Sequence, residues 1–269
     1  MTVNIKLQLA YDGTRYLGWQ KTSMGLSIEG QLMHALAAIL HYSPTLQAAS
    51  RTDAGVHAEG QEVNFIAQAP PDDLGALHYG LNALLPNDIA VRSVAIMPQP
   101  FHPTIDCLEK EYRYSVCFDT VLLPHRRCYC WHVPYDDPDI AAAQRAAAYF
   151  IGEHDFTAFC GIRKNKGYAS YVRKLYALTC HRYNEQEYCF TLRGNSFLYK
   201  MVRIIVGTLV YVATGRLAAE TIPAILASRQ RALAGITAPA YGLTLQRVRY
   251  PMHVLGAVKT TKACQQISV

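Results

Sequence analysis

Arg51-Thr52-Asp53-Ala54-Gly55-Val56-His57 joins two segments that are predicted as β-strands, residues 46–49 and 62–67. The loop between them, residues 50–60, gathers an arginine, an aspartate, a histidine and a glutamate, and Gly55 lets the backbone turn where a Cβ would obstruct it. Loops that are held by flanking strands commonly carry catalytic groups. Spacing alone nevertheless favours a structural turn with a surface ion pair between Arg51 and Asp53, which stabilises little.

The two-residue spacing of Arg51 and Asp53 has a chemical consequence if the loop is extended there. Both side chains then point to the same side, and the guanidinium keeps the carboxylate ionised. An ionised carboxylate suits a nucleophile or a base and does not suit a general acid. Asp53 is therefore the candidate catalytic residue of this loop, with the structural turn as the alternative reading.

The chain on either side of this loop predicts alternating strands and helices. Residues 3–10 place Val3, Ile5, Leu7 and Leu9 on one face, which is the period of a strand. Helices are predicted where apolar residues recur at helical spacing between capping residues and prolines. Up to a cluster of prolines, the predicted elements are strand 3–10, helix 28–40, strands 46–49 and 62–67, helix 72–85 and strand 89–96.

The second half begins again with an alternating strand. Asp137 is predicted to cap a helix that has Pro138 at its first position, and Gly152 to close it. The predicted elements are strands 112–118 and 128–133, helix 138–151, strands 171–183 and 187–194, helix 200–214, a short helix after Thr221, strand 243–250 and a loose tail over 259–269.

This order of elements predicts an α+β protein made of two similar subdomains. Pro98, Pro100 and Pro103 break regular structure, so the boundary is expected there. The predicted division is an N-terminal subdomain of residues 1–104, which carries the aspartate loop, and a C-terminal subdomain of residues 105–269. The two subdomains are expected to share one sheet.

Composition permits a folded, mildly basic protein. The chain has 269 residues, 51% of them hydrophobic, and a formal net charge of +6. Such a charge is compatible with a nucleic-acid partner but does not require one. The 18 tyrosines point in the same direction, because tyrosine stacks on bases, although most tyrosines are explained by sheets and interfaces.

The eight cysteines are expected to be free thiols in a cytoplasmic protein. Residues 3–9 alternate like a strand and not like a signal peptide, and no apolar run is long enough to span a membrane. Cys128 and Cys130 with His125 and His132 are the one cluster that resembles metal ligands. Their spacing is not that of a usual zinc site, and alternation along a strand explains them better, so no metal is expected.

Several motifs in order carry a resemblance to a known family. The run from Arg51 to Ala58 resembles the signature of the tRNA pseudouridine synthase A family. The motifs that accompany it cover nearly the whole chain up to Tyr250: residues 11–20, 81–89, 101–103, 110–114, 152–159 and 197–207.

This resemblance implies the fold, the reaction and the partners. It implies the pseudouridine synthase fold, with a mostly antiparallel sheet, flanking helices and a central RNA-binding cleft. It implies isomerisation of uridine to pseudouridine at positions 38, 39 and 40 in the tRNA anticodon stem-loop, without a cofactor and by a homodimer. The target base must leave the stack, because C1′ and both base faces have to be accessible.

The resemblance also assigns roles to individual residues. Asp53 corresponds to the essential aspartate, Tyr112 to the tyrosine that contacts the target base, and Arg203 to the arginine that pairs with the aspartate. Arg51 corresponds to the arginine that takes the place of the flipped nucleotide. From the residues alone, the alternative for Tyr112 is a buried strand tyrosine, and the alternative for Arg203 is a surface arginine, which is unusual in so apolar a helix.

Two positions depart from the pattern of the family. Ser50 stands where the signature usually has glycine, which puts the backbone geometry before the loop in question. Tyr199-Lys200 replaces the commoner histidines. Neither departure removes a catalytic group.

A basic and aromatic stretch is a candidate for contacts with RNA phosphates, although a solvated loop explains it nearly as well. Its cations are Arg163, Lys164, Lys166, Arg173 and Lys174. Two rival functions are a non-catalytic RNA-binding protein and a hydrolase that uses Asp53 with His57. No nucleophilic serine or cysteine motif supports the hydrolase, and His57, His102 and His154 are expected to be structural.

Overall fold

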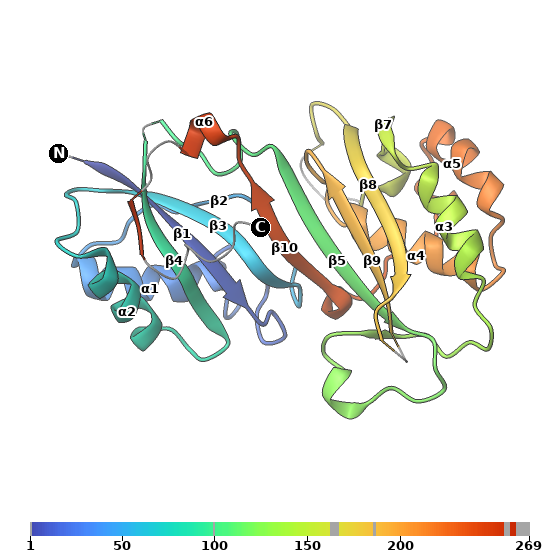
Figure 1. Ribbon diagram of the computed structural model, residues 1–269, viewed down its shortest axis with the longest axis horizontal. Coiled ribbons are helices and arrows are strands. Elements are labelled where there is room, and N and C mark those ends of the chain that lie inside the picture. Colours follow the sequence, from blue (N-terminus) through green and yellow to red (C-terminus); the bar gives the residue numbers. More distant parts are fainter. Residues whose placement is uncertain (1, 99, 162–166, 185–186, 256–258, 262–269) are drawn as a thin grey trace. The chain divides into compact units, whose positions relative to one another are not determined.

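Antiparallel strands form the centre of each half of the chain. The computed structural model describes residues 2–98, 100–161, 167–184, 187–255 and 259–261 (Figure 1). The chain divides into two units: unit 1 is Met1–Leu108 together with the chain from Leu245 onward, and unit 2 is Glu109–Thr244.

Unit 1 is built around strand β1 (Val3–Tyr11), which pairs antiparallel with β3 (His57–Ala67) on one side and β4 (Ile89–Met97) on the other. Its other elements add two short strands, strand β10 and three helices. These are β2 (Gln47–Ala48), β11 (Lys259–Thr260), β10 (Leu243–Arg249), α1 (Ile28–Leu40), α2 (Leu74–Leu84) and α6 (Met252–Leu255).

The two faces of the unit 1 sheet differ in chemistry. Ile5, Leu7 and Leu9 are fully buried on one face, as the alternation predicts. α1 begins at the capping side chain of Ser27, which accepts a hydrogen bond from the Gly30 amide, and its buried apolar residues face this core. The opposite face carries Asn4, Lys6 and Gln8, of which Asn4 is buried and the other two are half-buried.

Unit 2 contains an antiparallel sheet in the order β5 (Glu109–Cys117), β9 (Glu187–Gly194), β8 (Val172–Arg182) and β7 (Gly152–Asp155). The short strand β6 (Trp131–His132) pairs parallel with β5. The helices are α3 (Ile140–Ala148), α4 (Met201–Ala213) and α5 (Ile222–Ser228). Short 3₁₀ helices are η1 (Pro124–Arg126), η2 (Thr157–Phe159), η3 (Ala219–Thr221), η4 (Arg231–Leu233) and η5 (Ala240–Gly242).

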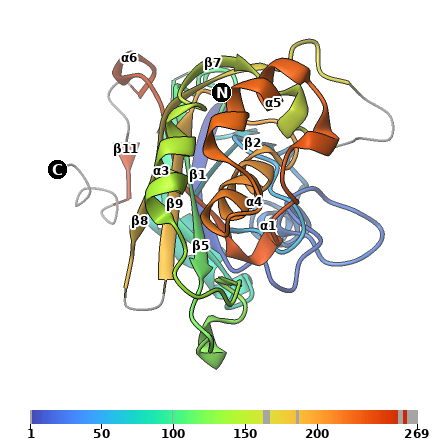
Figure 2. The same cartoon turned by 90° about the vertical axis from the view of Figure 1, so that its right-hand side faces the viewer.

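The helices of unit 2 cover one face of its sheet. In the view of Figure 2, α4 and α5 lie to one side of strands β8 and β9, and α3 contacts both α4 and β8. α4 is buried along nearly its whole length, so it forms the centre of this unit's core. An aromatic cluster of Phe150, Phe156 and Phe159 packs beside it; the Phe159 ring meets the other two edge-to-face, and those two are stacked.

The predicted α+β class with mostly antiparallel strands is confirmed. The helix that follows Pro138 is capped by Asp139, whose carboxylate accepts from the Ala142 amide. The prediction of Asp137 as the cap was wrong, because Asp137 has φ 52° and lies in the turn before the helix.

Two further expectations need correction. The strand predicted over 128–133 is reduced to Trp131–His132, because residues 124–130 form a 3₁₀ helix and turns. Within the predicted loose tail, Lys259–Thr260 pairs with β4, whereas residues 262–269 lie outside the described part. The subdomain boundary at 104/105 stays a prediction; the structure adds that the chain after Leu245 packs with unit 1.

The seven cysteines among the described residues form no disulfide, and no metal-binding group of His, Cys, Asp or Glu occurs there. Each described helix is too short or too polar to cross a membrane.

Candidate active site

The Asp53 loop leaves the sheet after β2 and returns at the start of β3. Its backbone is tied to residues 11–20, here called the opening motif, by two hydrogen bonds: Trp19 N donates to Thr52 O at 3.0 Å, and Gly55 N donates to Tyr16 O at 3.3 Å. Within the loop, Val56 N donates to Asp53 O at 3.1 Å, which closes a turn at Gly55, with φ +77°. Asp53 itself is half-buried.

Two glycines of the opening motif let the loop approach this closely. A Cβ on Gly13 would lie 2.0 Å from Val56 O, and a Cβ on Gly18 would lie 2.6 Å from Thr52 O. Gly18 also has φ +93°, which side chains rarely adopt. The opening motif therefore packs directly against the Asp53 loop and supports its backbone. The sequence motif alone does not reveal this role.

Ser50, which replaces the usual glycine of the signature, does not strain the backbone. Its φ is outside the left-handed region in which glycine is favoured. The Ser50 amide and carbonyl both form hydrogen bonds with the side chain of Gln61. The departure at this position is therefore accommodated without distortion.

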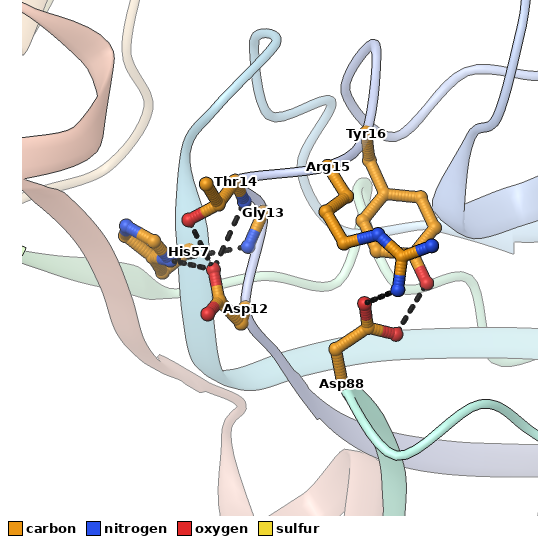
Figure 3. A network of polar contacts seen from close by, with 7 residues as sticks. All are labelled: Asp12, Gly13, Thr14, Arg15, Tyr16, His57 and Asp88. Carbon is orange, nitrogen blue, oxygen red and sulfur yellow. Dashed lines mark hydrogen bonds and ion pairs between the residues drawn. The ribbon is translucent and has the colours of Figure 1, made fainter. Parts of the chain in front are cut away.

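A polar network holds the opening motif in turn (Figure 3). Asp12 Oδ1 accepts hydrogen bonds from the amide of Thr14 at 2.9 Å and from its hydroxyl at 2.5 Å. His57 Nδ1 lies 3.1 Å from both Gly13 N and Asp12 Oδ1. The Gly13 amide can only donate, so His57 Nδ1 is the acceptor of this hydrogen bond.

The same network reaches the turn before β4. Asp88 accepts from the hydroxyl of Tyr16, lies 3.6 Å from the guanidinium of Arg15, and its carbonyl accepts from Asp12 N at 2.9 Å. Burial and the hydrogen bond to Asp88 raise the pKa of the Tyr16 phenol. The family-like motif at 81–89 thus acts as a support for the opening motif, and through it for Asp53.

Tyr112 and Phe197 come together in unit 2. Tyr112 lies on β5 opposite Leu192 of β9 and is 6% exposed. Its ring meets that of Phe197 edge-to-face, with centroids 5.0 Å apart and an interplanar angle of 80°. The neighbouring strand tyrosine, Tyr114, is fully buried and donates to Pro239 O at 2.7 Å, so Tyr114 has a structural role.

Arg203 lies in the first turn of α4 and is half-buried. Its Nε donates to Ala238 O at 2.7 Å. The segment that contains Ala238 crosses α4 closely: a Cβ on Gly207 would lie 2.0 Å from Ile236 O. The helix begins after Lys200, which has φ 59°, so the chain turns sharply between Phe197 and Arg203.

The candidate RNA-contact residues fall into three groups. Arg163, Lys164 and Lys166 lie outside the described residues. Arg173 Nη1 donates to the carbonyls of Ser170 and Val172, and its guanidinium lies 5.5 Å from the Tyr168 ring centre. Lys174 is exposed on β8, so of the described candidates it is the better placed for a phosphate.

The three histidines that were expected to be structural contact the backbone. His57 does so at Gly13 N, His154 Nε2 lies 3.1 Å from Ile151 O, and His102 Nδ1 accepts from Thr104 N. These contacts support the structural reading of all three rings.

A family model described as tRNA pseudouridine synthase matches residues 146–251. The matched region begins in α3 and includes the Arg203 helix and β10. Enzymes that form pseudouridine in tRNA are therefore the class that this part of the chain resembles.

Relatives over nearly the full length identify the family more closely. The chain is 49% identical to tRNA pseudouridine synthase A 2 of Protochlamydia amoebophila, over 92% of this chain and 94% of the relative. It is 40% identical to tRNA pseudouridine synthase A of Chlamydia trachomatis serovar L2b over 93% of each chain, and 38% identical to that of Thermoanaerobacter sp. over 92% and 99%. The chain belongs to the tRNA pseudouridine synthase A family.

Proposed function

We propose that the chain isomerises uridine to pseudouridine at positions 38, 39 and 40 of the tRNA anticodon stem-loop, with Asp53 as the catalytic carboxylate. Membership of the family makes the chain a tRNA pseudouridine synthase, which is an isomerase. The resemblance implies the three positions and the role of Asp53. They follow from the family motif that runs from Arg51 to Ala58.

The reaction is an internal rearrangement of one nucleotide. The C1′–N1 glycosidic bond breaks, the uracil turns, and C5 joins C1′; C5 then loses its proton and N1 carries one. Nothing is oxidised or reduced and no group is added, so the chemistry needs no external reactant. An ionised Asp53 can attack carbon or accept a proton from the sugar.

The remaining site residues have roles that match their chemistry. Tyr112 is proposed to contact the target base with its ring and to relay a proton through its hydroxyl. Arg203 is proposed to hold Asp53 ionised and aimed through a charge-assisted contact. Arg51, which is exposed in the loop, is proposed to fill the place that the flipped nucleotide leaves and to pair with phosphate.

The proposed role of Asp53 is supported by the way in which the backbone of its loop is fixed. Hydrogen bonds from Trp19 and to Tyr16, and two glycines without room for a Cβ, fix the backbone on both sides of Asp53. A surface turn with an ion pair does not need this support, whereas a catalytic group must be held in a productive geometry. The hydrolase alternative is disfavoured because His57 already bonds the opening motif.

tRNA is the proposed partner, and a cytoplasmic homodimer is the proposed form of the enzyme. Lys174, and beyond the described residues Arg163, Lys164 and Lys166, are proposed to contact phosphates, which attract cations strongly. In a dimer one subunit would orient the tRNA while the other reacts.

Mapping of pseudouridine in unmodified tRNA after incubation with the wild-type protein tests this proposal. The expected result is pseudouridine at positions 38, 39 and 40 wherever uridine occurs there. Pseudouridine only at other positions would refute the site assignment. Binding of tRNA without any pseudouridine would refute the enzyme in favour of the RNA-binding alternative.

A further inference from the structure

Gln61 is a polar side chain in a position that the strand pattern reserves for apolar residues. It alternates with Val63 and Phe65 along β3, lies opposite Leu9 of β1, and is fully buried. A buried amide without partners would destabilise the fold. Its hydrogen bonds therefore indicate why a glutamine stands here.

The amide of Gln61 replaces a backbone partner for the strand that leads into the Asp53 loop. β2 pairs with β3 up to Ala48, and Ala49 N still donates to Glu62 O at 2.8 Å. At Ser50 the pairing changes: Ser50 N donates to Gln61 Oε1 at 3.2 Å, and Gln61 Nε2 donates to Ser50 O at 2.5 Å. A side-chain amide has the donor and acceptor of a peptide group but reaches further from the strand.

The hydrogen bonds between Ser50 and the side chain of Gln61 let the chain leave the sheet at a defined place. In an antiparallel ladder the residue that follows a hydrogen-bonded pair turns its N–H and C=O away from the partner strand, so Ser50 needs another partner as the chain leaves β3. With the side chain of Gln61 between them, the chain separates from β3 while both polar groups of Ser50 stay satisfied. Asp53 follows three residues after this point of departure.

A second set of hydrogen bonds connects Gln61, through Tyr11, to Thr52, the residue before Asp53. Gln61 Nε2 lies 3.4 Å from Tyr11 Oη, and Tyr11 Oη lies 2.8 Å from Thr52 Oγ1. Tyr11 and Thr52 are 5% and 8% exposed, so these contacts are shielded from water and are stronger for it. The carbonyl of Thr52 is held separately by Trp19 N.

We propose that Gln61, Tyr11 and Thr52 form a positioning network that sets the place of Asp53 in the pseudouridine reaction. The network holds the loop at Ser50 and Thr52, which lie three residues and one residue before Asp53. This inference rests on the proposed catalytic role of Asp53. None of the three residues needs to touch the substrate, so their loss should lower the rate of the chemical step and leave tRNA binding intact.

Hydroxyl deletions test the network with the least disturbance of the core. In Tyr11→Phe and Thr52→Val, we expect kcat for release of tritium from C5-labelled uridine in tRNA to fall about tenfold or more, since small misplacements of a catalytic group are costly. The Kd for tRNA should change by less than about twofold. Thr52→Ser, which keeps the hydroxyl, should restore most of the lost kcat.

The two deletions should also be non-additive. Because both remove the same Tyr11–Thr52 contact, Tyr11→Phe/Thr52→Val should be about as slow as either single variant. Tyr250→Phe is the control, since it removes the hydroxyl of a half-buried tyrosine that donates to Pro103 O elsewhere in unit 1. Its kcat should equal that of the wild type.

The outcomes separate this inference from the proposed function. Wild-type kcat in folded Tyr11→Phe and Thr52→Val, with Asp53→Ala inactive, would overturn the network alone. Equal loss of kcat in Tyr250→Phe would also overturn it, because the loss would then reflect general destabilisation. An active Asp53→Ala would instead refute the catalytic role on which the network depends. Gln61→Met, if it folds, should behave like Tyr11→Phe.

Discussion

Arg203 and Ala238 are joined by two hydrogen bonds of opposite direction. Arg203 Nε donates to Ala238 O at 2.7 Å, and Ala238 N donates to Arg203 O at 3.1 Å. Both the side chain and the backbone of Arg203 are therefore bonded to the backbone of Ala238. This arrangement uses one edge of the guanidinium to fix its orientation, and the planar group can then present its remaining donors in a set direction.

Replacement of this arginine by lysine should impair catalysis although the charge is kept. In Arg203→Lys a single flexible ammonium has to replace both the Ala238 contact and the proposed contact with Asp53. We expect kcat to fall about a hundredfold, as for removal of an aligned electrostatic group. Arg216→Lys, an exposed arginine just beyond the same helix, should leave kcat unchanged. Wild-type kcat in Arg203→Lys would show that this arginine does not act in the reaction.

The close contact between Gly18 and the Asp53 loop should make this glycine irreplaceable. Gly18→Ala would place a Cβ 2.6 Å from Thr52 O at a φ of +93°, so the loop must shift. We expect a loss of about 1–3 kcal/mol in the free energy of unfolding by urea, with a fall in kcat. Gly80→Ala, in helix α2, meets the flexible end of Ile39 at 3.3 Å and should be neutral or stabilising. Equal behaviour of the two variants would contradict the tight contact.

The polar face of the unit 1 sheet should depend on a buried ion pair. Lys6 Nζ lies 3.0 Å from Glu62 Oε2, and Gln8 donates to the other oxygen at 2.9 Å. In Lys6→Met the carboxylate loses its charge partner, and the free energy of unfolding should fall by about 3 kcal/mol at neutral pH. Lys6→Met/Glu62→Gln should regain most of this loss. A double variant that is less stable than Lys6→Met would contradict the pairing.

Lys6→Met should also differ from the wild type in how its free energy of unfolding depends on pH. Burial raises the pKa of the Glu62 carboxyl and the neighbouring Lys6 lowers it, so loss of Lys6 raises the folded-state pKa of Glu62 further above its value in the unfolded chain. The stability of Lys6→Met relative to the wild type should therefore rise as the pH is lowered from neutral, until Glu62 is protonated in the folded state. Urea unfolding at several pH values measures it, and a pH-independent difference would argue against a charged Glu62.

The two described cations of the basic stretch should respond differently to substitution. Lys174→Ala should weaken tRNA binding and reduce the slope of log Kd against log salt by about one. Arg173→Ala should instead lower stability, because its guanidinium bonds two backbone carbonyls and lies over Tyr168. Titrations at several salt concentrations, with urea unfolding of both variants, separate these effects. An unchanged salt slope in Lys174→Ala would remove it from the phosphate contacts.

Periodicity predicted most of the fold because the strands and helices of this chain have regular burial. The helix over 28–40 and the strand over 187–194 have the observed bounds. Prediction failed where local turns compete with a regular pattern, as at Asp137 and Cys128. The predicted start of β3 at Glu62 was also too late, because the burial of polar residues such as His57 and Gln61 in the first half of this strand depends on long-range contacts that no local pattern reports.

Motifs predicted the candidate site residues but not their supports. Asp53, Tyr112 and Arg203 stand in recognisable runs, whereas the partner of Arg203 is a backbone carbonyl 35 residues away. Because every residue has a backbone carbonyl, the sequence does not indicate which of them is the partner of Arg203. Gln61 could have been noticed, since a glutamine that alternates with Val63 and Phe65 is an exception to the apolar face and so requires buried partners.

The central claim is that Asp53 carries out the chemistry on a loop built to hold it. The most direct test is pseudouridine formation in unmodified tRNA by Asp53→Asn, which removes the charge and keeps the shape, with tRNA binding measured in parallel. We expect no detectable pseudouridine and a Kd within about threefold of the wild type, as for a residue that acts in the chemical step. Pseudouridine formation at the wild-type rate by Asp53→Asn would contradict the account and place the chemistry elsewhere.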